Sequence, residues 1–141
     1  MPGRFRFEGN YFSVDGWLAP ALVRRPELWV AGVSRATLRR AAKTGVWHPV
    51  ALSVDELGEL GRGFEGRTVL RLSTYFADEP KTGEDERGRH AVEGPPDWIA
   101  ERLAEYVEAG CDGFVINLGH ESPELEDRVR RFGAEVVPLL T

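Results

Sequence analysis

The sequence predicts an α/β fold built from four consecutive β/α units around a parallel sheet. After residue 26, short apolar runs alternate with segments whose apolar residues recur at helical spacing, the pattern of parallel strands joined by right-handed crossovers. The 141 residues are the usual size of one domain and far fewer than the roughly 250 of a complete eight-unit β/α barrel. With 42% apolar and 29% charged residues, the composition is that of a globular protein.

The chain begins with a predicted hairpin and a first β/α unit. Residues 4–14 alternate aromatic and polar side chains around the turn Glu8-Gly9-Asn10, as a hairpin does. Residues 28–31 then form a short apolar strand. Ser34 is placed to cap a helix that Gly45 closes at its C-terminal end.

The second and third units are predicted from residues 46–52, a strand broken by a proline, and 68–76, the clearest strand of the chain. Between them, Ser53 and Glu56 have the spacing of a capping box, which starts a short helix. Residues 77–94 read as a polar loop, either a functional lid or a disordered insert.

The last part of the chain contains two predicted helices around a fourth strand. Asp97 opens a helix that ends at Gly110, and residues 112–118 form the strand. The pair Ser122-Pro123 begins the final helix, and Pro138 stops it.

The charge balance excludes several classes of partner. With 23 acidic and 18 basic residues the net charge is −5, which argues against nucleic-acid and anionic-membrane binding. The longest strongly apolar stretch, residues 28–33, is far below the roughly 20 residues of a membrane span. We see no targeting signal and expect a cytoplasmic protein. The single cysteine, Cys111, excludes an internal disulfide, and the three histidines lack metal-ligand spacing, so no metal site is predicted.

Two groups of residues at predicted strand ends are candidates for ligand binding. The turn Ala31-Gly32-Val33-Ser34 leads into a helix N-terminus, where free amides and the helix dipole favour phosphate; alternatively, Gly32 only permits a tight turn and Ser34 only caps the helix.

The second group follows the second and fourth strands. Trp47 and His48 end one strand, and Asn117 and His120 end the other, on the face where barrel enzymes place their chemistry. An imidazole such as that of His48 exchanges a proton near neutral pH. The alternatives are a core tryptophan beside an exposed histidine, and an asparagine that makes a turn.

The order of several motifs resembles the C-terminal half of luciferase-like monooxygenases, barrel enzymes that use reduced FMN or a deazaflavin coenzyme. Each motif is weak alone, but together they cover nearly the whole chain in the family's order. The matching stretches are FEGNYF (7–12), RPELWVAGVSRA (25–36), LRRAA (38–42), WHP (47–49), GPPDWIA (94–100), YVEAGCD (106–112) and RFGAEVVPLL (131–140).

The resemblance implies half of a TIM-type (β/α)8 barrel as a single domain, with residues 1–26 as hairpin and lead-in and 27–141 as four β/α units. It also implies an oxidoreductase with FMN or the deazaflavin coenzyme (F-420 type) and a small-molecule substrate. The residues that match the family's coenzyme and catalytic positions, or end the same strands, are Ala31, Gly32, Val33, Ser34, Trp47 and Asn117 for the coenzyme and His48 and His120 for catalysis.

Two features leave a second interpretation open. Ala31 replaces the first glycine of the family's usual pair, and the segment before Trp47 lacks the usual aspartate. A non-catalytic subunit that keeps the fold and has lost the coenzyme is therefore the alternative. In either case four parallel strands leave two open sheet edges, so we expect a homodimer or a separate N-terminal half-barrel chain as partner.

Overall fold

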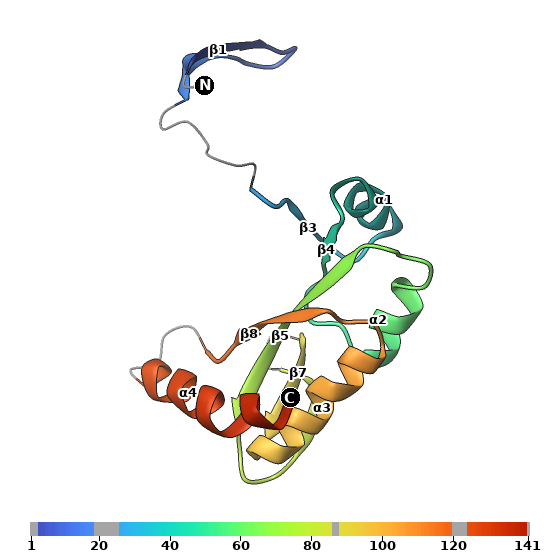
Figure 1. Ribbon diagram of the computed structural model, residues 1–141, viewed down its shortest axis with the longest axis vertical. Helices are drawn as coiled ribbons and strands as arrows, with labels where there is room; N and C mark the ends of the chain where they lie inside the picture. The colour runs from blue at the N-terminus through green and yellow to red at the C-terminus, as the bar shows by residue number, and fades with distance from the viewer. Residues whose placement is uncertain (1–2, 19–25, 86–87, 120–123, 141) are drawn as a thin grey trace.

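The computed structural model describes residues 3–18, 26–85, 88–119 and 124–140. Over these residues the protein is a mixed α/β structure with a sheet of mainly parallel strands and four α-helices. The N-terminal hairpin stands apart from this sheet and its helices (Figure 1).

The predicted hairpin is confirmed. Strands β1 (Gly3–Glu8) and β2 (Ser13–Leu18) pair in antiparallel register, so β2 runs four residues beyond the predicted end at Val14. The Gly9 amide donates to the Phe12 carbonyl at 3.1 Å and closes the turn.

The four predicted parallel strands are also present. Their spatial order is β3 (Trp29–Ala31), β4 (Val46–His48), β5 (Arg67–Phe76) and β8 (Gly113–Asn117), and each neighbouring pair is parallel. Each strand is followed in the chain by one α-helix. These are α1 (Arg35–Thr44), α2 (Val54–Leu60), α3 (Pro96–Glu108) and α4 (Leu125–Arg131).

The prediction of a loop over residues 77–94 is wrong. This segment forms β6 (Lys81–Glu84) and β7 (His90–Gly94), an antiparallel pair, and β7 also lies parallel to the end of β5. The Asp85 carboxylate closes the connection between them, because it accepts from both the backbone amide and the guanidinium of Arg89. As an edge strand β6 buries little, so its polar sequence lacks the alternation that marks a strand.

The helices cover one face of the sheet and form the core with it. Trp47 from β4 and Leu70 and Leu72 from β5 are completely buried there. From α3, Ile99 and Leu103 pack into the same cluster. The buried residues of α3, Ile99, Ala100, Leu103 and Tyr106, thus belong to this core, as expected for one face of an amphipathic helix.

The capping box at the start of α2 is confirmed. The Glu56 amide donates to Ser53 Oγ at 3.3 Å, and the Ser53 amide donates back to the Glu56 carboxylate at 2.8 Å. These bonds satisfy two amides that a helix start leaves without a partner.

We therefore expect Ser53→Ala to lower the free energy of unfolding by about 1 kcal/mol. Ser53→Thr keeps a hydroxyl acceptor at the cap and is the control. Urea denaturation of both variants at one protein concentration measures the difference, and an alanine variant as stable as the wild type would contradict the assignment.

The C-terminal helix differs from its prediction at both ends. Its predicted start, Ser122-Pro123, lies outside the described residues. After α4 the chain continues as a π-helix (Phe132–Val136) and a 3₁₀-helix (Val137–Leu140) rather than stopping at Pro138. Pro138 is second in the 3₁₀ turn, where a missing amide proton costs no hydrogen bond.

None of the described helices is long and apolar enough to span a bilayer; the longest of them, α3, has 13 residues.

Candidate functional site

The second face of the sheet, opposite the helices, carries three of the candidate residues, Ala31, His48 and Asn117. Strand register and side-chain alternation place every second residue of β3, β4, β5 and β8 on it. We call this surface the open face; it carries Trp29, Ala31, His48, Arg71, Ser73, Val115 and Asn117, together with Val46, Arg67, Val69, Tyr75 and Gly113. Trp29 is 42% exposed and Val115 is 37% exposed, so none of the described residues fully covers these apolar side chains.

The predicted turn of residues 31–34 lies at the edge of the open face. Gly32 has φ of +125°, which side-chain-bearing residues rarely adopt, and its amide donates to the His48 carbonyl at 3.4 Å. The Ser34 hydroxyl caps α1 by accepting from the Thr37 amide at 3.2 Å. The two structural roles proposed for this turn, a tight turn at Gly32 and a helix cap at Ser34, are thus present. The first turn of α1 contains no acidic residue, so nothing there repels an anion.

Trp47 lies on the other face of the sheet. It is 0% exposed, and its indole N–H donates to the Gly32 carbonyl at 2.7 Å. The ring of Phe64 packs edge-on against it at 6.0 Å. Since Trp47 is sealed in the core, it positions the turn at Gly32 and does not reach the open face.

His48 is held in place by two contacts. Its Nδ1 lies 2.6 Å from the Val69 carbonyl oxygen, and its ring tilts against Trp29 with centroids 5.3 Å apart. A carbonyl only accepts, so Nδ1 carries the proton in the neutral ring and Nε2 is the basic nitrogen. The geometry thereby leaves one defined nitrogen for proton exchange.

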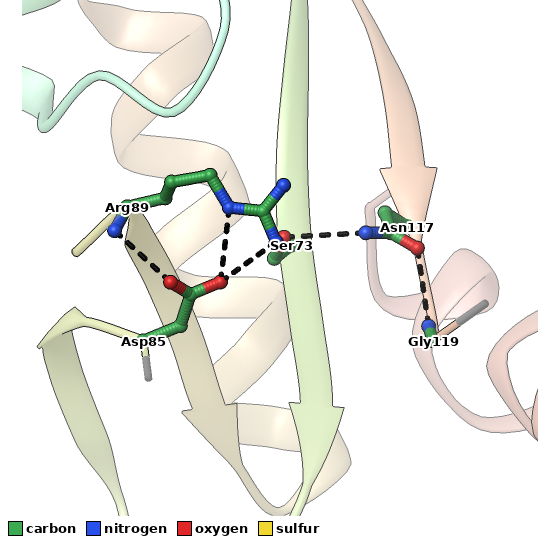
Figure 2. Close-up of polar contacts among 5 residues, drawn as sticks. All are labelled: Ser73, Asp85, Arg89, Asn117 and Gly119. Carbon is green, nitrogen blue, oxygen red and sulfur yellow. Dashed lines mark hydrogen bonds and ion pairs between the residues drawn. The ribbon is translucent and has the colours of Figure 1, made fainter. Parts of the chain in front are cut away.

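Asn117 closes the turn after β8. Its carboxamide oxygen accepts from the Gly119 amide at 3.1 Å, and its nitrogen donates to Ser73 Oγ at 3.4 Å (Figure 2). Figure 2 also shows Asp85 and Arg89 on the opposite side of β5. The turn-making role that the sequence left open is therefore present, and it fixes the orientation of the amide.

The candidates are only partly brought together. Ala31 and His48 are register partners, as are Ser73 and Asn117. His48 stands at the level of Val69, four residues before Ser73, so the two pairs are separated by about 13 Å along the sheet. His120 lies outside the described residues.

Sequence reasoning missed Arg71. This arginine is half-buried in the middle of β5, between Leu70 and Leu72, and among the described residues its guanidinium has no ion-pair or hydrogen-bond partner. By contrast, Arg67 nearby pairs with Glu27 at 3.1 Å. The sequence signal that could have found Arg71 is a charged residue between two core leucines of a strand, because the side chain of such a residue must face away from the core.

A separate groove of about 590 Å³ lies on the helix side of the sheet, between α2, α3 and the β6–β7 pair. His90, Arg102 and Tyr106 are among the residues that line it. Arg102 stacks on Trp98 at 4.3 Å and pairs with Glu105 at 2.8 Å, so its charge is already balanced. None of the predicted site residues that the structure describes lines this groove.

His90 makes the stability dependent on pH. Burial lowers the pKa of His90 below that of a free imidazole, and the nearby Glu56 carboxylate partly opposes the shift. The unfolded chain therefore binds this proton more readily, and we expect the free energy of unfolding to fall as the pH decreases through about 6.5.

His90→Gln removes the titrating imidazole, so the loss of stability on going from about pH 7.5 to 5.5 should be smaller in the variant. Denaturant titrations at several pH values compare the two proteins. Parallel curves would show that His90 does not contribute.

The chain was compared with family models, curated proteins and solved structures. No family model and no curated protein matches it. Among solved structures it is similar to an F420-dependent secondary alcohol dehydrogenase in complex with an F420–acetone adduct, with 13% identity and a TM-score of 0.68 over 98% of this chain and 56% of that one. It is also similar to apo-MsnO8, with 16% identity and a TM-score of 0.55 over 86% of this chain and 52% of that one.

At these identities the likeness shows the fold alone, and it supports the luciferase-like fold that the sequence motifs indicate. The chain spans about half the length of the two structures.

Proposed function

We propose that the chain is a half-barrel of a luciferase-like oxidoreductase and that its open face binds a deazaflavin coenzyme. The observation that carries the proposal is the half-buried guanidinium of Arg71, which has no ion-pair or hydrogen-bond partner among the residues that the structure describes and lies on the same face as His48 and Asn117. An unpaired charge of this kind favours an anionic ligand. The F420-dependent enzyme of similar fold favours the deazaflavin over FMN.

The described residues fit an anionic coenzyme. A phosphate would lie at the turn of residues 31–34, whose conformation depends on Gly32, and Arg71 would balance further negative charge. Ser34 supports this turn by capping α1, and Trp47 supports it from the core. Ala31 and Val33 flank the phosphate position, and Val33 is 47% exposed.

When bound, a reduced deazaflavin supplies a hydride equivalent to a small-molecule substrate. His48 would hold at Nε2 the proton that the substrate takes up along with the hydride, because Nδ1 is engaged by the Val69 carbonyl. Asn117 would orient the ligand through an amide that is already fixed. We retain His120 as the second candidate for proton transfer.

In this proposal residues 1–26 form the hairpin and lead-in, and residues 27–141 form one half of a TIM-type barrel. The other half of the barrel comes from a second copy or from a separate N-terminal half-barrel chain, because four strands cannot close a barrel.

A second function is favoured by one specific observation. Gly32 N–H and Ser34 Oγ, two groups that would meet a phosphate, already have partners within the chain. A non-catalytic subunit that keeps the fold without the coenzyme would use these bonds only for stability.

Titration of the whole protein with the deazaflavin coenzyme and, separately, with FMN distinguishes the two functions. The enzyme proposal predicts saturable quenching of coenzyme fluorescence with a micromolar Kd, stronger for the deazaflavin. Absence of quenching by either coenzyme at millimolar protein would refute the enzyme proposal and support the non-catalytic subunit.

Val33→Asp tests the phosphate position. A carboxylate on this exposed residue would repel the phosphate, and we expect Kd for the coenzyme to rise about 10-fold. Val33→Asn has nearly the same shape without the charge and should bind almost as the wild type does. If both variants weaken binding equally, charge at this turn is not the cause.

A further inference from the structure

The connection between β6 and β7 places an arginine on the side of the open face. In β7, His90 lines the groove on the helix side of the sheet, so alternation puts its neighbour Arg89 on the opposite side. Figure 2 shows Arg89 on the side of β5 opposite Asn117, with its side chain reaching toward Ser73. Ser73 and its register partner Ala91 are each 6% exposed although they lie on this side of the sheet, so this end of the face is covered.

The Asp85 carboxylate fixes the orientation of the Arg89 guanidinium. Its Oδ2 accepts from Arg89 Nε at 3.2 Å and from Nη2 at 3.0 Å, and its Oδ1 accepts from the Arg89 backbone amide at 3.0 Å. The side chain of Asp85 is only 8% exposed and that of Arg89 is 30% exposed. A guanidinium that is held along one edge loses less side-chain entropy when its other edge binds a ligand.

Among the described residues, nothing occupies the second edge of the Arg89 guanidinium. Its Nη1 has no hydrogen-bond or ion-pair partner there, and Figure 2 shows a terminal nitrogen of this group pointing away from Asp85. Nη1 and Nη2 present two parallel N–H groups along this edge. That is the geometry with which arginine binds a carboxylate or a phosphate through two hydrogen bonds.

The charges around this edge favour an anion with a single negative charge. Arg71 lies on the same face, two residues before Ser73 and about 7 Å from it along β5. Since Asp85 balances one of the two guanidinium groups, one positive charge is left over among the described residues at this end of the face. Lys81 and Glu93 are register partners at the next level, so their charges offset each other. A carboxylate carries one negative charge, whereas a phosphate monoester carries nearly two.

We propose that Arg89 binds a carboxylate of the substrate, so that the substrate is a carbonyl compound that also carries a carboxylate. This inference rests on the proposed function, in which the substrate takes up a hydride and a proton. The carbonyl carbon receives the hydride and its oxygen receives the proton, which leaves an alcohol and an oxidised coenzyme. Arg89 is then a specificity-determining residue, and Asp85 is the positioning residue that holds it.

The spacing along the sheet predicts where the carboxylate stands in the substrate. His48, which would hold the proton, lies at the level of Val69, about 13 Å from Ser73 along the sheet. The carbonyl and the carboxylate are therefore separated by several carbon atoms. Val115 pairs with Arg71 between these two levels and is 37% exposed, so it offers the carbon chain an apolar contact. An oxo acid of medium length fits this arrangement better than one whose two groups are adjacent.

Binding of an oxo acid and its amide to the whole chain tests the carboxylate site without the coenzyme. The probes are 6-oxoheptanoate and 6-oxoheptanamide, which have nearly the same shape and differ in charge. Isothermal titration calorimetry of the wild type should give a Kd of about 1 mM for the acid and a Kd roughly 10-fold higher or more for the amide. Equal affinity for the two probes, or no saturation by the acid up to about 50 mM, overturns the proposal.

The variant Asp85→Asn/Arg89→Gln removes the ion pair without leaving a buried carboxylate unpaired. We expect its Kd for the acid to rise about 10-fold, to the value for the amide. The control Glu126→Gln/Arg130→Gln removes an exposed ion pair of α4 and should leave Kd within about 2-fold of the wild-type value. Far-UV circular dichroism in urea compares the stability of the two variants. If the first variant binds the acid as tightly as the control does, the proposal is wrong.

Arg89→Lys separates the charge from the second edge, and it decides the matter if Asp85→Asn/Arg89→Gln does not fold. Lysine keeps the positive charge beside Asp85 but lacks the fork of N–H groups, so Kd for the acid should rise about 3- to 10-fold while the acid stays preferred over the amide. Wild-type affinity in the lysine variant would show that a point charge is sufficient, and it overturns recognition by the open edge.

Coenzyme titration distinguishes a failure of this inference from a failure of the proposed function. The Asp85→Asn/Arg89→Gln variant should quench deazaflavin fluorescence with the wild-type Kd, because the phosphate is expected at the turn of residues 31–34. If the wild type prefers the acid to the amide but binds no coenzyme, the proposed function fails and the carboxylate site remains. If it binds the coenzyme but does not distinguish the acid from the amide, the carboxylate site fails and the proposed function remains.

Discussion

Trp47→Ala is expected to lower the free energy of unfolding by about 3–5 kcal/mol, the cost of removing a large, fully buried aromatic side chain. Trp47 is 0% exposed, its ring packs against Phe64, and it belongs to the core cluster under α1 and α2. The alanine variant would leave a cavity between the sheet and the helices, and the Gly32 carbonyl would lose its donor.

Trp47→Phe separates these two losses. It keeps most of the ring volume and removes only the hydrogen bond to Gly32, so we expect a cost of about 1–2 kcal/mol. Because fluorescence changes with the tryptophan count, far-UV circular dichroism in urea at one protein concentration is the suitable measurement. An alanine variant no less stable than the phenylalanine variant would contradict the importance of the ring.

The phenylalanine variant also tests the link between the core and the candidate site. Loss of the bond to the Gly32 carbonyl should speed hydrogen exchange of amides in the turn of residues 31–34 more than in β5. Uniformly faster exchange would show instead that only global stability has changed.

Gly32→Ala is the second large effect, with an expected loss of about 2–4 kcal/mol. Two causes add. At φ of +125° a side chain strains the backbone, and an added Cβ would lie 2.8 Å from Thr37 Oγ1. Relief of that contact in Gly32→Ala/Thr37→Ala should make the double variant lose less than the sum of its two single variants.

Gly58→Ala is the matched control. Gly58 lies inside α2, an added Cβ there meets nothing within 4 Å, and its φ is not positive. Alanine has the higher helix propensity, so this variant should gain about 0.5–1 kcal/mol. Urea unfolding of the three proteins decides the matter, and a Gly32 variant as stable as the Gly58 variant would disprove the strain.

The parts of the fold that could be predicted are those with a strong local signal. The strand at residues 68–76 has an apolar run bounded by polar residues, and the structure extends it by only one residue, to Arg67. The capping box at Ser53 and the left-handed Gly45 are set by short-range hydrogen bonds, and both are present. The β6–β7 pair lacked such a signal, since its pairing with Ser73–Phe76 is a tertiary contact.

The candidate site was harder to predict because it depends on which face a residue takes. Trp47 and His48 are neighbours at a strand end, and alternation must put them on opposite sides. With three residues in β4 the sequence does not show which of them faces the core. In the structure the Trp47 side chain packs in the core and the His48 side chain lies on the open face. Arg71 was not predicted as a site residue because it lies within an otherwise apolar strand.

Strand β5 is the centre of the sheet, and this has a consequence for how the chain folds. Its partners are residues 46–50, 91–94 and 113–117, so the Val69–Gly113 pairing joins positions 44 residues apart. Such non-local contacts are slow to form because loop closure precedes any gain from pairing. During synthesis the edge of β5 that pairs with β8 therefore stays unpaired until β8 has left the ribosome, and in that interval a neighbouring nascent chain can compete for this edge.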